Sequence, residues 1–342
     1  MSDVEHSLAA TMRSAVARAA AARGTTSPNP PVGCVLLDVT GTEVGAGATQ
    51  PPGGPHAEVV ALRAAGERAR GGTAVVTLEP CAHHGRTPPC TDALIAAGVA
   101  RVVYAVADPN PVASGGARVL ADAGVSVEGG LLATEVERGP LRAWLHHART
   151  GRPHVTWKYA ATLDGRVAAA DRTSRWISSA TSRAEVHALR RAVDAVVVGT
   201  ATVLADDPAL TARAEDGTPA ARQPLRVVVG RTDLPPDAQV LDGTAETLLL
   251  RTRDPAEVLA ALAARGVVDV LLEGGPTLAG AFVAADLVDR VLAYVAPALL
   301  GAGPVALGAS GVSTITEAHR LVVEEATMSG PDVRISAVPA RN

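Results

Sequence analysis

The sequence of 342 residues has few aromatic side chains, a single lysine and three cysteines. Aromatic residues make up only 2% of the chain, which argues against a stacking platform for single-stranded nucleic acid. The formal net charge of −4 predicts no basic surface, so we expect no nucleic-acid partner. An odd cysteine count in a long chain does not suggest a disulfide framework. We therefore expect the protein to be located in the cytoplasm.

Targeting signals are also missing from the pattern. Residues 1–20 lack an apolar core behind a basic end, so we expect no secretory signal. Residues 291–316 carry no charge and are long enough to span a bilayer. Prolines and glycines interrupt that stretch, which favours a strand followed by a glycine-rich loop, and we expect no membrane partner.

The length and the 47% apolar content are sufficient for two domains in which strands and helices alternate. The first half predicts strands at 33–37, 43–48, 74–78 and 101–107, and helices at 4–23, 57–68, 91–97, 115–123 and 131–148. The second half predicts strands at 155–160, 195–198, 225–229, 247–250, 268–272, 290–295, 321–327 and 333–338, and helices at 181–192, 255–265 and 276–284. A polar stretch at 149–153 sets the predicted boundary between domains 1–148 and 149–342 of an α/β layered fold.

The strongest motif combines His56 and Glu58 at the start of a predicted helix with Cys81 and Cys90. One imidazole and two thiolates supply three zinc ligands and leave a fourth position for water, which is the catalytic arrangement. Zinc lowers the pKa of its water to about 7, and Glu58 is placed to carry a proton to a departing amino group. Zinc deaminases share this signature with two residues between the cysteines, whereas here a loop of eight separates them.

Each of these residues also has an ordinary interpretation. Two buried cysteines and a satisfied helix-end histidine would fit the pattern without metal, although the full set favours zinc. His83 and His84 are alternative ligands, or contacts to substrate. Asn29, in a rigid proline-rich turn, is either an ordinary turn residue or an amide that binds a ring or a sugar.

The second half is less explicit about its chemistry. Residues 301–306 imitate a dinucleotide fingerprint, but Pro304 and the following glycines argue against a helix there. A better candidate runs from Val270 to Thr277, where a strand ends in two glycines and Pro276 opens a helix. A helix N-terminus favours phosphate, yet a plain strand-to-helix turn explains the same residues.

Several segments together resemble the bifunctional riboflavin-biosynthesis deaminase/reductase family over nearly the whole chain. The first half contributes residues 28–33, 55–59, 78–90 and 108–111, and the second half contributes residues 162–166, 176–178, 201–208 and 273–277. The long loop between the cysteines is itself typical of this family.

The resemblance implies a cytidine-deaminase-like three-layer domain followed by a dihydrofolate-reductase-like domain. It implies zinc-dependent deamination of a diaminopyrimidinone that carries a ribosylamino 5′-phosphate. NADPH then reduces the ribosyl group of the resulting uracil to a ribityl chain. The partner is this small molecule, and the family favours a homodimer or homotetramer.

The resemblance also assigns roles in the second half. It places NADPH against Ala160, Trp176, Thr202, Asp206, Gly275, Pro276, Thr277, Leu278, Ala279, Gly280 and Ala281. It places substrate against Ser174, Arg190, Leu210, Arg213 and Glu273. An arginine fork suits a sugar phosphate, although two solvated arginines would look the same in sequence. The single lysine, Lys158, lies on a strand that enters this site, where it serves either the sugar or a structural ion pair.

Two departures from the family pattern leave an alternative open. Arg172 stands where glycine is common, and Arg231 follows Val229 and Gly230 where an Asp-Ser pair is common. A deaminase with a non-catalytic C-terminal oligomerisation module is therefore the second hypothesis. A nucleic-acid base deaminase is the third, and the negative charge and scarce aromatics argue against it.

Overall fold

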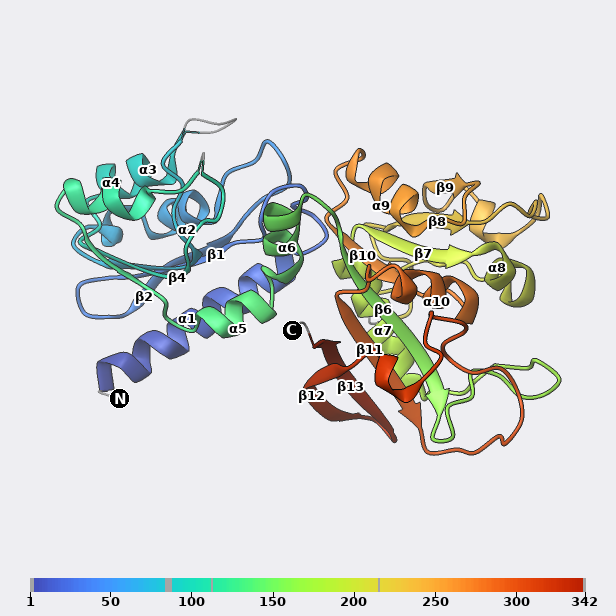
Figure 1. Ribbon diagram of the computed structural model, residues 1–342. Helices are drawn as coiled ribbons and strands as arrows, with labels where there is room; N and C mark the ends of the chain where they lie inside the picture. The colour runs from blue at the N-terminus through green and yellow to red at the C-terminus, as the bar shows by residue number, and fades with distance from the viewer. Residues whose placement is uncertain (1–2, 84–87, 112, 215, 341–342) are drawn as a thin grey trace. The chain divides into compact units, whose positions relative to one another are not determined.

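The computed structural model describes residues 3–83, 88–111, 113–214 and 216–340 (Figure 1). The chain divides into two compact units, Met1–Gly151 and Arg152–Asn342. The predicted boundary after residue 148 falls slightly earlier than this division, inside the helix Arg142–Thr150.

The first unit has one sheet of five strands in the order β2-β1-β3-β4-β5. β1 is antiparallel to both of its neighbours, and β3, β4 and β5 are parallel. The strands are β1 (Gly33–Leu37), β2 (Glu43–Ala48), β3 (Thr73–Leu78), β4 (Arg101–Val106) and β5 (Ser126–Gly129). The helices are α1 (Asp3–Ala22), α2 (Ala57–Ala65), α3 (Cys90–Ala96), α4 (Gly116–Asp122), α5 (Ala133–Arg138) and α6 (Arg142–Thr150).

Two glycines show how helices cover both faces of this sheet. Gly47 pairs with Cys34, the residue after Gly33, so Gly33 and Gly47 face opposite sides. A Cβ atom on Gly33 would lie 2.0 Å from the Ala15 carbonyl oxygen of α1. A Cβ atom on Gly47 would lie 2.6 Å from the Val60 side chain of α2. α1 and α2 therefore approach opposite faces closely, which gives the expected three layers.

The structure corrects three predicted elements of this unit. The helix predicted over 57–68 ends at Ala65 and continues as a 3₁₀ turn, Gly66–Ala69. The helix predicted over 131–148 is two helices, α5 and α6, because Gly139 and Pro140 interrupt it. Proline lacks the amide hydrogen and disfavours helical backbone in the residue before it. β5 was not predicted, since its side chains are mostly exposed and carry little apolar pattern.

The second unit has one sheet of eight strands in the order β12-β13-β11-β6-β10-β7-β8-β9. The six strands from β11 to β9 are parallel, whereas β13 is antiparallel to β11 and β12. The strands are β6 (His154–Thr162), β7 (Ala195–Gly199), β8 (Leu225–Val229), β9 (Thr247–Leu250), β10 (Asp269–Leu272), β11 (Arg290–Ala296), β12 (Leu321–Ser329) and β13 (Asp332–Pro339). The helices are α7 (Ala180–Ala192), α8 (Thr200–Asp206), α9 (Pro255–Ala263) and α10 (Pro276–Ala284).

Alternate residues of the central strands build a core on each face of this sheet. Val197 and Val270 belong to the core that includes side chains of α9 and α10. Val196 and Leu271 belong to the core on the other face, which includes Val203 of α8 and is completed by α7. Because six strands of this sheet are parallel, their carboxyl ends lie at the same edge, and ligands of open α/β sheets bind at that edge.

Residues 291–316 comprise most of β11, a loop and the start of a short 3₁₀ helix, in agreement with the predicted strand and glycine-rich loop. Among the described residues, no helix is long and apolar enough to cross a membrane. α8 was not predicted, because its start, Thr200, follows a strand directly and its N-cap, Gly199, offers no capping side chain.

Candidate functional site

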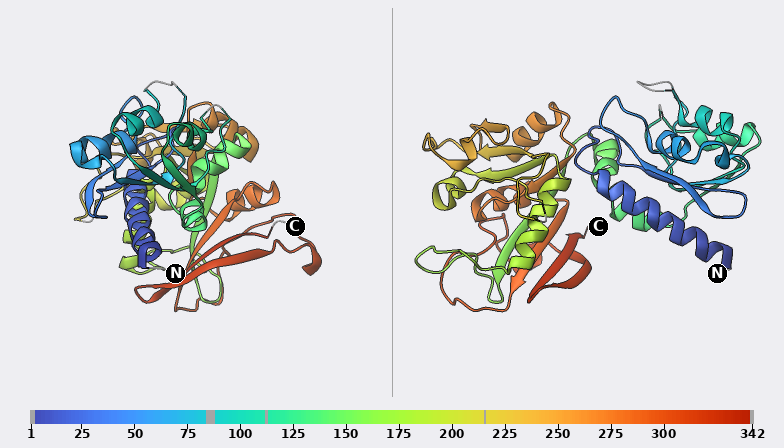
Figure 2. Two further views of the ribbon diagram at one scale, coloured as in Figure 1. Left: turned by 90° about the vertical axis from the view of Figure 1, so that its left-hand side faces the viewer. Right: turned by 180° about the vertical axis from the view of Figure 1, so that it is seen from behind.

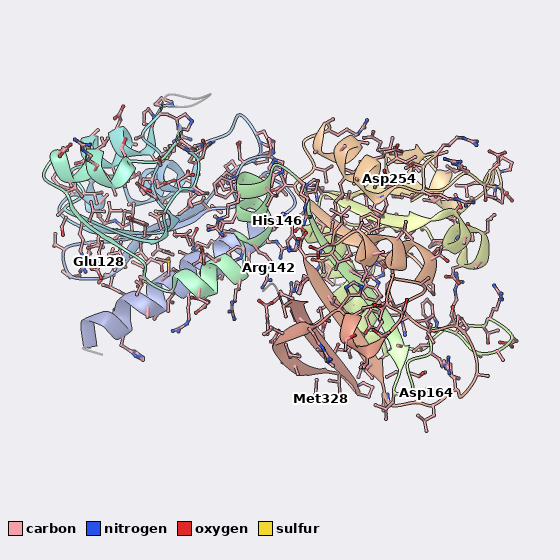
Figure 3. The ribbon with its side chains drawn as sticks, in the orientation of Figure 1. Glu128, Arg142, His146, Asp164, Asp254 and Met328 are labelled. Carbon is pink, nitrogen blue, oxygen red and sulfur yellow. The ribbon has the colours of Figure 1, made fainter. Side chains whose placement is uncertain are left out.

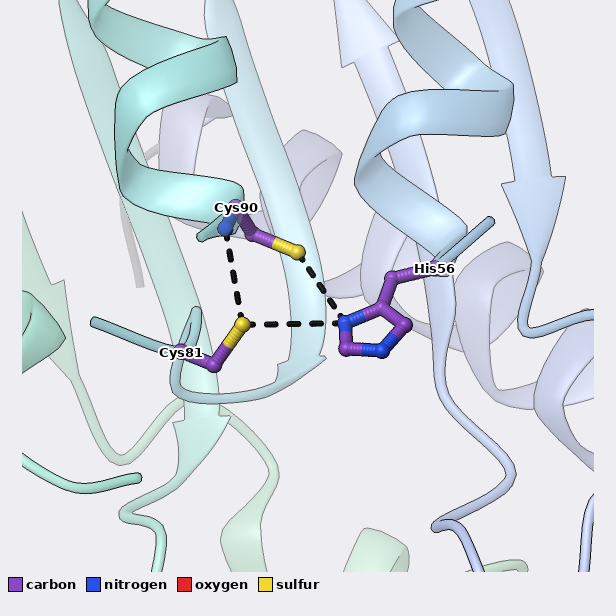
Figure 4. Close-up of side chains that lie close together, drawn as sticks. All are labelled: His56, Cys81 and Cys90. Atoms are coloured by element: carbon purple, nitrogen blue, oxygen red, sulfur yellow. Dashed lines mark hydrogen bonds between the residues drawn. The ribbon is translucent and has the colours of Figure 1, made fainter. Parts of the chain in front are cut away.

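Three side chains from separate parts of the first unit meet at one point (Figure 4). His56 caps the N-terminus of α2, Cys81 lies just beyond β3, and Cys90 begins α3. The Nδ1 atom of His56 is 3.6 Å from the Cys81 sulfur and 3.3 Å from the Cys90 sulfur. The Cys90 amide donates to the Cys81 sulfur at 3.4 Å. The ligand atoms of these three side chains lie within 4.8 Å of one another, which is close enough for them to hold one metal ion.

The donor set fits zinc. Bonds of about 2.3 Å to sulfur and about 2.0 Å to nitrogen in a tetrahedral site place these atoms roughly 3.5 Å apart. The observed separations between nitrogen and sulfur lie on either side of this value. The hydrogen bond with Cys90, followed by the one with His56, lowers the pKa of the Cys81 thiol. Thiolate is the form that binds metal.

A cavity of about 420 Å³ opens beside these ligands. His56, Glu58, Cys81 and His83 line it together with Asn29 from the proline-rich turn. Glu58 is 4% exposed, and burial raises the pKa of its carboxyl group. The Nδ1 atom of His83 is buried and has no hydrogen-bond partner among the described residues. The cavity is therefore polar on the metal side, where Glu58 and His83 line it.

Sequence reasoning missed part of this cavity. Its wall also includes Glu79, Asp108, Asn110 and Trp144. The available signal was the Asp108-Pro109-Asn110-Pro111 motif, which holds one of only three asparagines in the chain. Trp144 offered no local signal, because α6 reaches the cavity only through the fold. His84, considered as a ligand from the sequence, lies outside the described residues.

The second unit brings two predicted substrate residues into direct contact. Arg190 in α7 donates through Nε and Nη2 to the two Glu273 carboxylate oxygens, at 2.7 and 2.9 Å. Only 14% of the Arg190 side chain and 11% of the Glu273 side chain are exposed. Burial opposes ionisation of Glu273, but the charge and hydrogen bonds of Arg190 outweigh it and lower the pKa.

Lys158 belongs to the same group. Its strand, β6, pairs with β10 so that Trp157 lies beside Leu272, the residue before Glu273. The Lys158 ammonium lies 5.8 Å from the centre of the Tyr294 ring. Burial lowers the pKa of Lys158, and the positive charge of Arg190 adds to this effect, whereas Glu273 opposes it. Two cations and one carboxylate therefore lie together where β10 ends beside the middle of β6.

The loop after α8 packs against this group. Arg190 Nη1 donates to the Thr211 carbonyl at 3.1 Å, and His187 Nδ1 lies 3.2 Å from the same oxygen. Leu210, next to Thr211, is buried. Arg213 is exposed and donates to the Gly217 carbonyl, so it does not join Arg190 in a common fork.

Two of the predicted cofactor segments meet at the N-terminus of α10. The Gly275 amide donates to Thr202 Oγ1 of α8 at 3.2 Å, and residues 276–281 form α10 itself. Ser174 Oγ donates to Asp206 at 3.4 Å. The Ala160 side chain packs against the cluster of Val186, Leu292 and Tyr294.

Trp176, the remaining predicted cofactor residue, is exposed and has the Arg183 guanidinium 4.4 Å from its ring centre.

The rejected dinucleotide fingerprint at 301–306 has no helix directly after it. Asp164, labelled in Figure 3, accepts a hydrogen bond of 2.6 Å from the Gly301 amide and holds that loop instead.

Family models match both units. Residues 6–106 match the cytidine and deoxycytidylate deaminase zinc-binding region, and residues 153–334 match the RibD C-terminal domain. The Riboflavin biosynthesis protein RibD of Mycobacterium tuberculosis is 58% identical over 316 residues, which cover 92% of this chain and 93% of that protein. RibD of Escherichia coli is 42% identical and covers 93% of this chain and 95% of its own length.

Two solved structures are similar over nearly the whole chain. Acinetobacter baumannii RibD has a TM-score of 0.88 at 36% identity, covering 98% of this chain and all of that one. A diaminohydroxyphosphoribosylaminopyrimidine deaminase/5-amino-6-(5-phosphoribosylamino)uracil reductase from Thermotoga maritima has a TM-score of 0.90 at 32% identity, with the same coverage.

Fold, zinc-ligand geometry and these matches define a two-domain enzyme in which a zinc-dependent deaminase precedes an NADPH-dependent reductase. The chain belongs to the RibD family of bifunctional riboflavin biosynthesis proteins. The expected fold of both halves and the two expected cofactors are thereby confirmed.

Proposed function

We propose that unit 1–151 deaminates the diaminopyrimidinone ribosylamino phosphate and that unit 152–342 reduces the product. The substrate class is the one in the name of the Thermotoga maritima relative. The observation that carries this proposal is the convergence of His56, Cys81 and Cys90 beside a cavity that Glu58 also lines. The cavity is large enough to hold a single pyrimidine ring with polar groups around it.

In the deaminase, His56, Cys81 and Cys90 would hold zinc, which makes water a nucleophile at neutral pH. Glu58 lies two residues after His56 on the first turn of α2, with its carboxyl group in the buried wall of the cavity. In our proposal this carboxyl takes a proton from water and delivers it to the departing amino group. Asn29 and His83 orient the substrate in this proposal, since both line the cavity and both carry hydrogen-bonding side chains.

In the reductase, the N-terminus of α10 and the Gly275–Thr202 contact would receive NADPH, which would supply the hydride. Trp176 and Asp206 complete the cofactor surface. Lys158, in the middle of β6, lies beside Glu273 just after β10, and in this proposal Lys158 hydrogen-bonds the substrate. Arg190 holds Glu273 in place through two hydrogen bonds. Ser174, Leu210 and Arg213 belong to the surrounding segments that we assign to the substrate.

The decisive experiment follows ammonia and NADPH oxidation together in one sample of the purified enzyme with zinc. Turnover of the diaminopyrimidinone substrate should release ammonia first, with NADPH oxidation depending on that step. Ammonia without NADPH oxidation would overturn the reductase assignment. NADPH oxidation of the undeaminated substrate at the same rate would overturn the proposed order.

We also propose that the enzyme is a homo-oligomer whose contact surface is the β12–β13 hairpin. Figure 2 shows this hairpin extending from the edge of the second sheet, and Met328 on it is labelled in Figure 3. Val322, Val323 and Met328 are 54%, 59% and 66% exposed, and an edge strand with such side chains invites pairing with another chain. Light scattering of Val323→Asp should show smaller particles than the unchanged enzyme.

We propose the reducing cytoplasm as the compartment, because Cys34, Cys81 and Cys90 form no disulfide and two of them are assigned to zinc.

A further inference from the structure

Glu79 is a buried carboxylate beside the metal ligands for which the proposed deaminase chemistry has no use. It follows β3, lies two residues before Cys81, and is 7% exposed. Its Oε1 atom accepts hydrogen bonds from the amides of Gly115, at 3.2 Å, and Ala117, at 2.9 Å. Its Oε2 atom accepts one from the Asp108 amide at 3.1 Å. One side chain thus binds both ends of the segment between β4 and α4.

This segment forms a wall of the deaminase cavity. Asp108, Asn110 and Ala113 line the cavity, and Ala113 also packs against Cys81 and Cys90. The Asn110 amide donates to Asp108 Oδ1 at 2.8 Å, so the placement of Asp108 sets that of Asn110. The hydrogen bond from the Asp108 amide to the Glu79 carboxylate therefore connects Glu79 to this wall.

The other end of the segment is held equally closely. A Cβ atom on Gly116 would lie 1.7 Å from the Pro80 carbonyl oxygen, so α4 begins in contact with the turn that carries Cys81. The Ala82 amide also donates to the Ala113 carbonyl at 3.3 Å. Three amide donors already point at the Glu79 oxygens, and charge-assisted bonds of this kind are among the stronger ones in proteins.

We infer that Glu79 is a positioning residue for deamination, which fixes the Asp108–Asn110 wall relative to the zinc-ligand turn. The inference rests on the proposed function of the first unit and deepens it. Glu79 also lines the cavity, but backbone amides occupy both of its oxygens, so it acts on the substrate through Asp108 and Asn110 and does not bind zinc. The wall is therefore set in the free enzyme, before the substrate enters.

The test is Glu79→Gln in the full-length zinc enzyme. A glutamine can turn its oxygen to the Gly115 and Ala117 amides, but its NH2 group then faces the Asp108 amide, donor against donor. We expect KM for the diaminopyrimidinone substrate to rise about tenfold, with kcat within about threefold. Zinc content should be unchanged, and amide hydrogen exchange at Asp108 and Asn110 should speed up in the free enzyme. Glu79→Asp, which keeps the charge on a shorter arm, should give a smaller increase in KM.

NADPH oxidation with the deaminated substrate reports that the second unit of the variant is folded, and zinc content reports the same for the first unit. Asp194→Asn is the matched control, because Asp194 is a buried carboxylate that accepts from the amides of Val268 and Asp269 in the second unit. It should leave the deaminase KM unchanged. An unchanged KM in Glu79→Gln, or a raised KM with no change in exchange at Asp108, overturns the inference. Loss of zinc in that variant overturns it too. If the unchanged enzyme releases no ammonia, the proposed function itself fails.

Discussion

Replacing Glu273 with glutamine removes the only carboxylate bonded to Arg190 among the described residues, at a site shared with Lys158. Both partners of the pair are mostly buried, and breaking such a pair typically costs about 3–5 kcal/mol. Glutamine still offers one oxygen to the guanidinium, so we expect a loss near the lower limit, about 3 kcal/mol at pH 7. This corresponds to an exchange rate on the order of 100-fold faster for amides that open with the unit.

The shifted pKa of Glu273 determines how the loss of stability in Glu273→Gln should change with pH. The pKa of Glu273 is lowered in the folded protein, so its stabilising contribution is present above the unfolded pKa of about 4.3. The contribution is lost as the pH falls through the folded pKa, where Glu273 becomes neutral like glutamine. The difference in free energy of unfolding between the two proteins should therefore be constant from pH 7 to pH 5 and shrink at lower pH.

The assay is hydrogen exchange of the β10 amides in full-length protein, comparing Glu273→Gln with the unchanged chain at each pH. Glu246→Gln is the control, since Glu246 pairs with Arg265 at the surface and its loss should change exchange little. Equal exchange of Glu273→Gln and the unchanged protein at pH 7 would refute the reasoning. So would a difference that stays the same below the pKa of Glu273.

Three further predictions concern single residues. Glu58→Gln should keep zinc, measured by metal analysis, yet slow ammonia release by about 10²–10⁴-fold while the reductase reaction continues; full deaminase activity would remove the proton role. Cys90→Ser should lose zinc and deamination but still bind NADPH, which fluorescence titration can follow; stoichiometric zinc with intact deamination would contradict the ligand assignment. Gly280→Val should weaken NADPH binding, because a Cβ atom there would lie 2.3 Å from the Ala309 carbonyl oxygen of the neighbouring loop and displace α10. An unchanged affinity for NADPH would show that α10 does not set the cofactor site.

The sequence contained enough to predict the zinc ligands. His56, Cys81 and Cys90 stand next to predicted element ends, and the chemistry of their side chains restricts the metal. Trp144 and Glu79 could not be predicted as parts of that cavity, because their roles depend on which loops the fold brings together. A buried tryptophan or glutamate has no local pattern that separates a cavity wall from a core.

The contact between Arg190 and Glu273 illustrates the same limit in the second unit. The resemblance placed both near substrate, and an arginine fork was expected to suit a sugar phosphate. In the structure the fork of Arg190 is occupied by Glu273, 83 residues further along the chain. Arg213, the second arginine of the expected pair, is exposed on a different segment. The spacing of residues in the sequence cannot show which of several acidic side chains an arginine will pair with in the fold.

The two departures from the family pattern bear on whether the second unit reduces anything. Arg172 has φ 71°, the left-handed region that glycine adopts without strain, so the position keeps the backbone that makes glycine common there. Gly230 has φ 144°, and a Cβ atom on it would lie 2.5 Å from the Thr200 side chain at the start of α8. Arg231, which follows it, is exposed. Neither arginine belongs to the Lys158–Arg190–Glu273 group, and α8 and α10 remain joined by the Gly275–Thr202 hydrogen bond. The substitutions therefore do not favour a C-terminal unit that has lost reduction.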